Sequence, residues 1–419
     1  MGRPISRRQL LAGTGLASVG LAAAATVGGV AAGAAGAAGS TIGGGQSVPF
    51  TGPHQAGIAT VAQDQLAFAT YDVTAAGADG LAGLLATWTA AARQLVTGRP
   101  LDGSTDPAAP AADTGEAAGL GPSRLTLTVG FGPGLFDDRF GLAGRRPAAL
   151  ADLPAFAGDQ LDPAASGGDL CVQACADDAQ VAFHAVHNLT RLALGSATLR
   201  SLQLGFGRTS STSSDQSTPR NLLGFKDGTD NLLAQDTAGF DHFVWVGDDT
   251  DQPWMVGGTY LVARRIRARI EQWDRTPLAD QEAVIGRSKA SGAPLGGTHE
   301  HDPVDLDALG TGGYPVIPAG AHIRQAAPST NGGQRILRRG YSFSDGLDPV
   351  TGELDVGLFF LCFQRDPRTQ FVPIQRQLAS SDSLTQYVVH TASALFACPP
   401  GLGNDDDWGT ALLGDGRAY

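Results

Sequence analysis

Apolar residues follow two different spacings along this chain. In some segments they alternate with polar residues, as in a half-buried strand, and in others they recur every three or four residues, as on one face of a helix. The alternation predicts strands over 58–73, 124–130, 169–173, 199–207, 258–273, 340–344 and 356–365. The helical spacing predicts helices over 81–96, 178–194, 279–286, 371–378 and 384–395.

The predicted strands and helices are mixed in the same way in the two halves of the chain. This mixture indicates an α+β fold with antiparallel sheets, and a duplicated ferredoxin-like arrangement fits it. The Ser/Thr-rich segment 209–219 is the clearest low-complexity stretch, so we place the boundary between the halves there. Residues 40–55 then form a linker, 56–219 the N-terminal half and 220–419 the C-terminal half.

Residues 1–39 have the pattern of an export signal. Arg7 and Arg8 precede Gln-Leu-Leu, and an uncharged Ala/Gly/Leu/Val stretch with Ala-x-Ala sites follows. The arginine pair resembles a twin-arginine signal, which predicts the twin-arginine export machinery as a partner and an extracellular, periplasmic or cell-envelope location. A membrane anchor helix is the alternative, although Gly and Ala contribute little transfer free energy. Because many twin-arginine substrates cross the membrane folded around a cofactor, the signal also favours a bound redox cofactor.

The composition excludes several classes of function. With 29 Lys and Arg against 41 Asp and Glu, the formal net charge is −12, and the lysines are Lys226 and Lys289 alone. Non-specific nucleic-acid binding needs a basic surface that neutralises phosphates, so no nucleic-acid partner is expected. Four cysteines in 419 residues are too few for a disulfide scaffold.

Several short motifs have simple structural interpretations. The Gly-rich segment 130–134 lacks the G-x-G-x-x-G frame of a dinucleotide site. Cys171 and Cys175 lack a second pair at zinc spacing, so we interpret them, like Cys362, as buried apolar residues. The His-Glu-His run at 299–301 alternates as a surface metal site could, but its Gly/Pro/Asp-rich loop favours solvated side chains.

The strongest local signal is the segment 221–231, Asn-Leu-Leu-Gly-Phe-Lys-Asp-Gly-Thr-Asp-Asn. Gly224 and Gly228 frame Phe-Lys-Asp, so the backbone can approach a flat ligand closely there. Asp227 would then be an acid beside a flat apolar ligand. Taken alone, however, Asp-Gly-Thr is also an ordinary turn.

Two downstream regions change this interpretation. His322 lies between Pro318 and Pro328, an arginine pair follows in 335–343, and 357–366 is an apolar strand rich in Phe. A single histidine, an aspartate in a glycine-framed loop, an arginine pair and an apolar wall are the parts of a haem pocket. No Cys-x-x-Cys-His motif occurs, so covalent c-type attachment of haem is not expected.

With these motifs, the sequence resembles the dye-decolourising peroxidases, a family of haem peroxidases. The resemblance extends over roughly residues 55–402, and its most specific element is Gly-x-x-Asp-Gly accompanied by a downstream His and Arg. It implies two ferredoxin-like halves with antiparallel sheets that sandwich one non-covalent haem b. The matching segments are 167–173, 180–184, 224–231, 322–324, 335–343, 358–366 and 387–401.

The resemblance also implies roles for individual residues. His322 resembles the proximal ligand of the haem iron, and Asp382 is the candidate for the carboxylate that orients it. Asp227 and Arg338 resemble the distal pair, a proton shuttle and a stabiliser of charge on the peroxide, and which of them matters more is left open. The remaining residues expected at the haem are Gly224, Phe225, Lys226, Gly228, Thr229, Leu358 and Phe360.

Two further arginines are open to two interpretations. Arg324 and Arg339 either face the haem propionates or form surface salt bridges. Electrons from dyes too large for a buried haem would have to pass through surface aromatic residues. By residue type the candidates are Trp254, Trp273 and Tyr341, and core packing is the alternative for each.

The function implied is a secreted peroxidase that uses hydrogen peroxide to oxidise organic reductants, such as dyes or phenols, through a ferryl intermediate. One alternative is an exported haem-handling protein that releases iron from haem. Another is a non-catalytic binding module, because a fold does not fix a function. A homo-oligomer is compatible with each of these readings.

Overall fold

The antiparallel strands of both halves join in one nine-stranded sheet, ordered β5-β9-β2-β3-β1-β4-β7-β8-β6. This computed structural model describes residues 45–103 and 106–414. The expected signal (1–39) and the start of the expected linker (40–55) therefore lie outside the described residues. In the described ranges, no helix is both long enough and apolar enough to cross a membrane.

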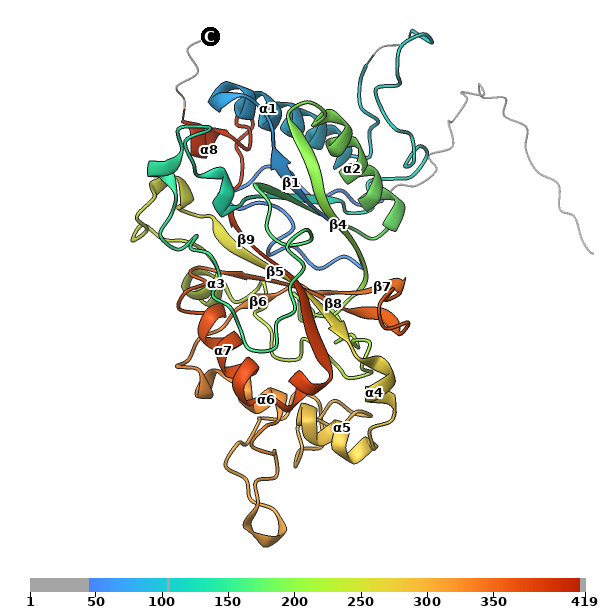
Figure 1. Cartoon of the computed structure of the whole chain (residues 1–419), viewed down its shortest axis with the longest axis vertical. Helices are drawn as coiled ribbons and strands as arrows, with labels where there is room; N and C mark the ends of the chain where they lie inside the picture. Colours follow the sequence, from blue (N-terminus) through green and yellow to red (C-terminus); the bar gives the residue numbers. More distant parts are fainter. Residues whose placement is uncertain (1–44, 104–105, 415–419) are drawn as a thin grey trace, which may run out of the picture. The chain divides into compact units, whose positions relative to one another are not determined.

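The N-terminal half has the order β-α-β-β-α-β of a ferredoxin-like unit, and its strands lie side by side as β2-β3-β1-β4. Figure 1 shows α1 and α2 next to each other at one end of the molecule, and α2 packs on β1 and β3. Trp88 and the four leucines of α1 are buried in the core that also contains residues of this sheet. The elements are β1 (Gln65–Val73), α1 (Gly77–Leu95), β2 (Thr126–Phe131), β3 (Leu170–Ala176), α2 (Ala179–Leu192) and β4 (Ala197–Arg208).

The C-terminal half repeats the arrangement, with its strands in the order β9-β5-β8-β7. Here the first helical connection is a long insertion, and α7 supplies the second. The duplicated ferredoxin-like prediction is thus confirmed. The elements are α3 (Thr237–Phe243), β5 (Thr259–Ala268), α4 (Ile270–Asp274), α5 (Leu278–Ile285), α6 (His322–Gln325), β6 (Leu337–Arg338), β7 (Tyr341–Leu347), β8 (Leu354–Gln364), α7 (Phe371–Ser381), β9 (Val388–Cys398) and α8 (Thr410–Leu413).

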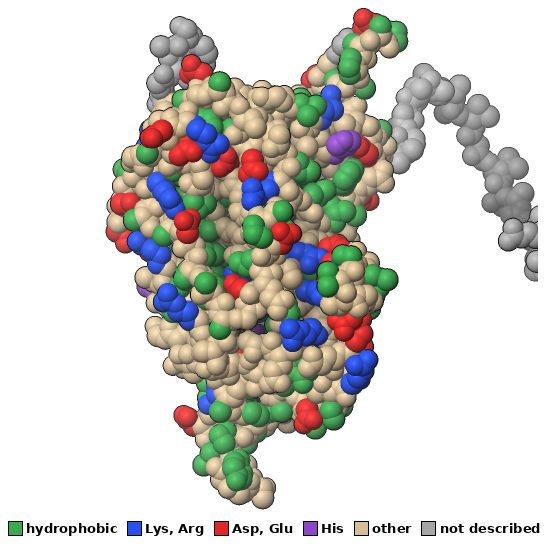
Figure 2. All heavy atoms as spheres, viewed as in Figure 1, with side chains coloured by type: hydrophobic (Ala, Val, Ile, Leu, Met, Phe, Trp, Pro, Cys, Tyr) green, Lys and Arg blue, Asp and Glu red, His purple; other side chains and the backbone are tan. Residues whose placement is uncertain are grey.

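The two halves are joined edge to edge. β4 pairs with β7 at Phe206↔Ser342, and β2 pairs with β9 at Phe131↔Ala397. Because β5 also pairs with β8, the strands close into a ring. One buried apolar cluster draws side chains from both halves, including Phe68. On the face that Figure 2 shows, acidic and basic side chains are interspersed.

Three predicted elements differ from the structure. The expected strand 58–73 begins only at Gln65, because residues 58–64 precede β1 without strand pairing. The expected helix 384–395 is wrong, because most of it belongs to strand β9, which pairs with β5 from Thr259↔Cys398 to Ala268↔Val388. Its apolar residues happen to recur at helical spacing, but pairing with β5 overrides that local pattern. The expected strand 258–273 ends at Ala268, where the chain turns into α4.

The Ser/Thr-rich segment at the expected boundary is well packed at its start. Residues 209–213 are buried. The Thr212 hydroxyl donates to the Thr60 carbonyl at 3.0 Å, and the Ser210 hydroxyl donates to the Arg338 carbonyl at 2.8 Å. These small hydroxyl side chains therefore bind the start of the segment to both halves, which its low-complexity sequence did not indicate.

Glu116 fastens the long loop between α1 and β2 to helix α2. Its carboxylate is hydrogen-bonded to Nδ1 of His184 at 2.8 Å and to Nδ1 of His187 at 2.5 Å, and the Thr114 hydroxyl also donates to it. Burial would raise the pKa of Glu116, but the hydrogen bonds from His184 and Thr114 outweigh it and lower the pKa from 4.5 to about 2.

Replacing Glu116 by glutamine is expected to lower the free energy of unfolding near neutral pH by about 1 kcal/mol. Because the folded-state pKa lies below the ordinary value of 4.5, this stabilisation is present above about pH 4.5 and is lost as the pH falls towards 2. Urea unfolding at about pH 7 and about pH 3 checks it. The difference between wild type and variant should shrink at the lower pH, and an equal difference at both would contradict the assignment.

Candidate active site

A cavity of about 520 Å³ lies in the C-terminal half. Its walls come from the segments 209–210, 221–230 and 322–340, from strands β5, β8 and β9, and from helix α7. Figure 1 shows α5, α6 and α7 gathered in this part of the molecule. Protein sites for cofactors measure about 300–1,000 Å³, so the cavity can take a large planar group.

His322 opens the short helix α6 and lines the cavity. Its Nδ1 is hydrogen-bonded to Oδ2 of Asp382 at 2.6 Å, and Oδ1 of Asp382 accepts from the Leu384 amide at 2.8 Å. The Ser383 amide donates to the Gly320 carbonyl, which holds the two segments together. Nε2 of His322 has no hydrogen-bond partner among the described residues, and its side chain is 34% exposed because it faces the cavity.

The carboxylate of Asp382 determines the direction of the pKa shift of His322 and which ring nitrogen faces the cavity. Asp382 is buried, with a side chain only 4% exposed. Burial would lower the pKa of His322, but the charge and hydrogen bond of Asp382 outweigh it and raise that pKa. Since Asp382 holds Nδ1, the imidazole presents Nε2 to the cavity as the atom available to a metal ion.

Asp227 and Arg338 form an ion pair on the wall of the same cavity. Nη1 of Arg338 donates to Oδ1 of Asp227 at 3.0 Å, and the Asn221 amide donates to Oδ2 at 3.1 Å. The backbone of Arg338 is fixed on both sides, because its N–H donates to Asn231 and its carbonyl accepts from Asn231 and Ser210. Both charges lie close enough to His322 to influence its pKa.

Gly228 is required by the shape of the loop. It has a φ of +92°, which favours glycine, and an added Cβ would lie 2.6 Å from the Cα of Ser210. This close approach brings the Asp227 loop against the segment that anchors Arg338. The ion pair therefore depends on a backbone contact that no other residue type allows.

Replacing Gly228 by alanine is expected to destabilise the fold by about 1–3 kcal/mol and to weaken haem binding, because the loop 221–230, which forms part of the cavity wall, must shift as a whole. Gly167→Ala is a matched control, since Gly167 has a φ of +74° but open space around its Cβ position. Thermal unfolding and haem titration of both variants separate the effect of φ from that of the clash. Equal haem affinity in the two variants would contradict the predicted role of the contact.

The walls of the cavity are largely apolar. Phe225, Leu358 and Phe360 line it, as expected, and Gly228 and Thr229 do so as well. The ring of Trp273 packs edge-on against Phe225 at 5.9 Å and supports it from behind. Further apolar residues of the wall are Leu222, Leu223, Ile266, Ala268, Ile285, Ile323, Ile336, Phe371, Ile374, Leu378, Leu384 and Val388. One free imidazole nitrogen in such a cavity fits haem, which needs an axial ligand and apolar walls.

Two predicted cofactor contacts are corrected. Arg324 donates to the carbonyls of Leu306 at 2.6 Å and Ile317 at 2.8 Å, and Arg339 is fully buried and donates to Thr60 and Gln63. Neither lines the cavity, and neither forms a surface salt bridge. Arg339 points away from the cavity because side chains alternate along an extended chain, and the preceding Arg338 faces the cavity.

Of two further residues expected at the cofactor, Lys226 lines the cavity and Gly224 does not. Lys226 borders the cavity, but its ammonium group pairs with Glu300, and Thr229 donates to the same carboxylate at 3.2 Å. Burial would raise the pKa of Glu300, yet the hydrogen bond from Lys226 lowers it. Gly224 has a φ of +85° and lies against Lys289, so it shapes the loop without lining the cavity.

The structure adds cavity residues that sequence reasoning missed. His390 lies on the wall, and Nε of the buried Arg264 donates to its Nδ1 at 3.1 Å. Burial and the charge of Arg264 lower the pKa of His390 to about 3, so the ring is neutral and carries its proton on Nε2. Arg287 and Arg335 also line the cavity. His390 and Arg335 lie in the matching segments 387–401 and 335–343, but neither had been given a role, and Arg287 lies outside every matching segment. Their positions on the wall become visible only when the strands and the insertion are assembled.

The aromatic residues considered for surface electron transfer are not at the surface. Tyr341 is 0% exposed, Trp273 1% and Trp254 6%. Core packing is therefore the observed environment of all three. Trp273 nevertheless packs against the wall residue Phe225 and against Tyr387, whose ring lies 4.9 Å away.

The cysteines and the histidine-rich loop play no part in the cavity. All four cysteines are buried and free, as expected for apolar residues of the core. In the loop 299–301 the side chains of His299 and His301 are 85% and 72% exposed. Within the described ranges, no cluster of three or more His, Cys, Asp or Glu side chains is arranged to hold a metal ion.

The apolar cavity combines an imidazole held by a carboxylate with a carboxylate–guanidinium pair. Together with the two ferredoxin-like halves, this arrangement is that of a haem peroxidase. Residues 55–207 match the family described as Dyp-type peroxidase, N-terminal, and residues 218–403 match Dyp-type peroxidase, C-terminal. The chain belongs to the Dyp-type peroxidase family. It is an oxidoreductase, and its cofactor is haem.

Individual relatives agree with this assignment. A DyP-type peroxidase from Streptomyces coelicolor is 41% identical with a TM-score of 0.82, covering 90% of this chain and 100% of that one. Ferric DtpA from Streptomyces lividans is 41% identical with a TM-score of 0.81 and the same coverage. The deferrochelatase of Escherichia coli strain K12 is 38% identical over 371 residues, which is 87% of each chain.

Proposed function

We propose that this protein is an exported peroxidase that uses hydrogen peroxide to oxidise organic reductants such as dyes or phenols. The observation that carries the proposal is the Asp227–Arg338 ion pair on the wall of the cavity that also contains His322. An apolar cavity that only stored haem would have no need of a carboxylate and a guanidinium fixed beside it. The two side chains are only 27% and 19% exposed, and holding charges partly out of water is costly without a function.

The chain's residues would hold haem through His322. Its Nε2 would bind the haem iron, and Asp382 keeps the imidazole in the tautomer that leaves Nε2 free. Phe225, Leu358 and Phe360 line the cavity and would exclude water from the porphyrin. When bound, haem supplies an iron centre that takes two oxidising equivalents from peroxide and returns them one electron at a time.

Asp227 and Arg338 then handle the protons and charge of the peroxide. The Asp227 carboxylate takes the proton from one peroxide oxygen and delivers it to the oxygen that leaves as water. The Arg338 guanidinium stabilises the negative charge that develops during cleavage. Their 3.0 Å hydrogen bond and the Asn221 contact keep the carboxylate in one orientation, so no reorganisation is needed during the reaction.

A second function is favoured by a specific observation. Relatives that are 38% identical are named deferrochelatase, so release of iron from haem is the competing proposal. Both functions require the haem cavity. They differ in product, because a peroxidase oxidises its reductant and keeps its iron, whereas iron release leaves an intact metal-free porphyrin.

One experiment distinguishes the two. The haem-loaded protein is mixed with hydrogen peroxide and guaiacol, and, separately, with an electron donor and an iron chelator without peroxide. Turnover of guaiacol with an unchanged porphyrin-to-iron ratio supports the peroxidase. Appearance of fluorescent metal-free porphyrin together with chelated iron, without guaiacol oxidation, would replace it by iron release.

The proposed export rests on the arginine pair at Arg7 and Arg8 and the uncharged stretch behind it. Replacing both arginines by lysine keeps the charge and removes the twin-arginine signal. Haem-loaded protein should then remain in the cytoplasm instead of reaching the cell envelope or medium. Fractionation of cells that express the full chain measures this, and unchanged export of the variant would contradict the route.

A further inference from the structure

One short segment of the C-terminal half separates the haem cavity from solvent. It consists of residues 300–306, which lead into the orange loop that Figure 1 shows beyond α5 and α6. Val304 and Leu306 line the cavity, yet Val304 is also 37% exposed, and its neighbours Pro303 and Asp305 are exposed as well. This segment, which we call the strap, is therefore a wall only one chain thick.

The first end of the strap is tied to the loop that contains Asp227. The Glu300 carboxylate accepts from the Lys226 ammonium group and, at 3.2 Å, from the Thr229 hydroxyl, and these two residues lie on either side of Asp227 in the chain. The Glu300 side chain is only 12% exposed, and its backbone carbonyl accepts from Nη1 of Arg287 at 3.0 Å. A charge-assisted bond that is largely shielded from water is stronger than a surface ion pair.

The other end of the strap is tied to helix α6. Nη2 of Arg324 donates to the carbonyl of Leu306 at 2.6 Å, and Arg324 lies two residues after His322 on the same short helix. The strap therefore runs from the segment that contains Asp227 to the segment that contains His322. Lys226 and Arg324, which were both expected to contact the cofactor, are the two side chains that hold it.

Few other bonds connect the strap and its loop to the rest of the fold. Among the described residues, the remaining hydrogen bonds of 301–316 are made within 298–316, such as those that Asp302 accepts from the Thr298 and His299 amides. A segment with exposed backbone and few outside bonds opens at a lower free energy than the core. A porphyrin is a rigid plane, and such a thin, weakly tied wall is the part that can move to let it pass.

We propose that the strap is a lid through which haem enters and leaves the cavity, with the Glu300–Lys226 ion pair as its latch. The proposal rests on haem as the cofactor and does not depend on the proposed peroxidase function. Haem passes only while the lid is open, so a weaker latch raises the rates of entry and exit together. The affinity, which is set by the ratio of these two rates, then stays nearly constant.

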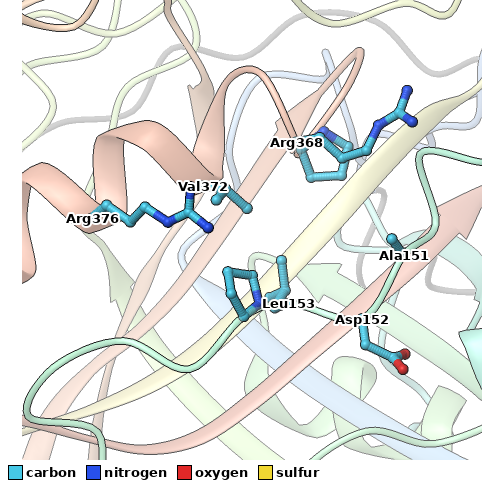
Figure 3. Close-up of a pocket in the computed structure, with 8 residues that line it drawn as sticks. Ala151, Asp152, Leu153, Arg368, Val372 and Arg376 are labelled. Atoms are coloured by element: carbon cyan, nitrogen blue, oxygen red, sulfur yellow. The ribbon is translucent and has the colours of Figure 1, made fainter.

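The test compares Glu300→Gln with Asp152→Asn in haem-loaded protein. Both variants replace a carboxylate by an amide. Asp152 lies beside helix α7 in the region that Figure 3 shows, pairs with Arg146 at 3.3 Å, and makes no hydrogen bond with the described residues of the strap. Transfer of haem to excess apomyoglobin, followed at the Soret band, measures release. Glu300→Gln should release haem about fivefold to fiftyfold faster than wild type, the effect of losing a hydrogen bond between charged groups. Asp152→Asn should release it at the wild-type rate.

Two further measurements keep the outcome decisive. Haem-free Glu300→Gln should also take up haem faster by a similar factor, with nearly unchanged affinity. Glu300→Asp, which keeps the charge on a shorter side chain, is the milder variant and should give rates between those of wild type and Glu300→Gln.

Two results would overturn the lid. Faster release combined with slower uptake would show a damaged cavity, and equal release from Glu300→Gln, Asp152→Asn and wild type would show that Glu300 latches nothing. Guaiacol turnover by the haem-loaded wild type is a separate readout, so a failure of the lid and a failure of the proposed function are told apart.

Discussion

Replacing His322 by alanine is expected to abolish stable haem binding. No other described side chain presents a free imidazole nitrogen to the cavity in a ligand-ready tautomer, since His390 carries its proton on Nε2. Partners of a metal ligand typically contribute 10–100-fold in affinity, so loss of the ligand should exceed about a hundredfold. Titration of metal-free protein with haem, followed at the Soret band, measures the loss.

Asp382→Asn serves as the graded comparison. The asparagine can still accept a hydrogen bond from Nδ1 but removes the charge that raises the pKa of His322. Haem affinity should fall by about 10–100-fold, and the Soret band should shift because the imidazole becomes a weaker donor. Wild-type affinity and an unchanged spectrum in His322→Ala would show that the ligand is another residue, whatever Asp382→Asn does.

Most of the fold could be predicted because hydrophobic spacing reflects local structure. Period two and period 3.6 located the longer elements other than β9, although not the short α3, α4, α6, β6 and α8, and their repetition indicated two ferredoxin-like halves. The prediction for strand β9 was wrong because its apolar residues also fit the spacing of a helix, and only pairing with β5 decides between strand and helix. The joining of both halves in one closed sheet could not be predicted either, because it depends on contacts between residues distant in sequence.

The candidate site could be predicted only in part, because a motif identifies residues but not the directions of their side chains. Asp227, His322, Arg338 and Asp382 lie in motifs that a resemblance can transfer, and the structure brings them to one cavity. The direction of a side chain is not contained in a motif. Arg339 follows Arg338 directly yet points to the opposite side, where it bonds to Gln63.

The haem-loaded Asp227→Asn variant is expected to react with hydrogen peroxide about a hundred to ten thousand times more slowly than wild type, because general acid–base catalysis contributes that range. Asparagine keeps the size of the side chain and can still contact Arg338 and Asn221, but it cannot take up the proton of the peroxide. Stopped-flow absorbance of the Soret band, with peroxide in excess and no reductant, isolates this step from electron donation.

Arg338→Leu should slow the same step by about a hundred to a thousand times, the effect of losing one preorganised charge stabiliser. Because Arg338 also orients Asp227 through their 3.0 Å hydrogen bond, the two residues act as a unit. The double variant should therefore be little slower than the slower single variant, whereas independent roles would multiply the two losses. Haem affinity, which depends on His322, should change little in either variant. Rates within a few-fold of wild type in both single variants would show that neither residue handles the peroxide proton.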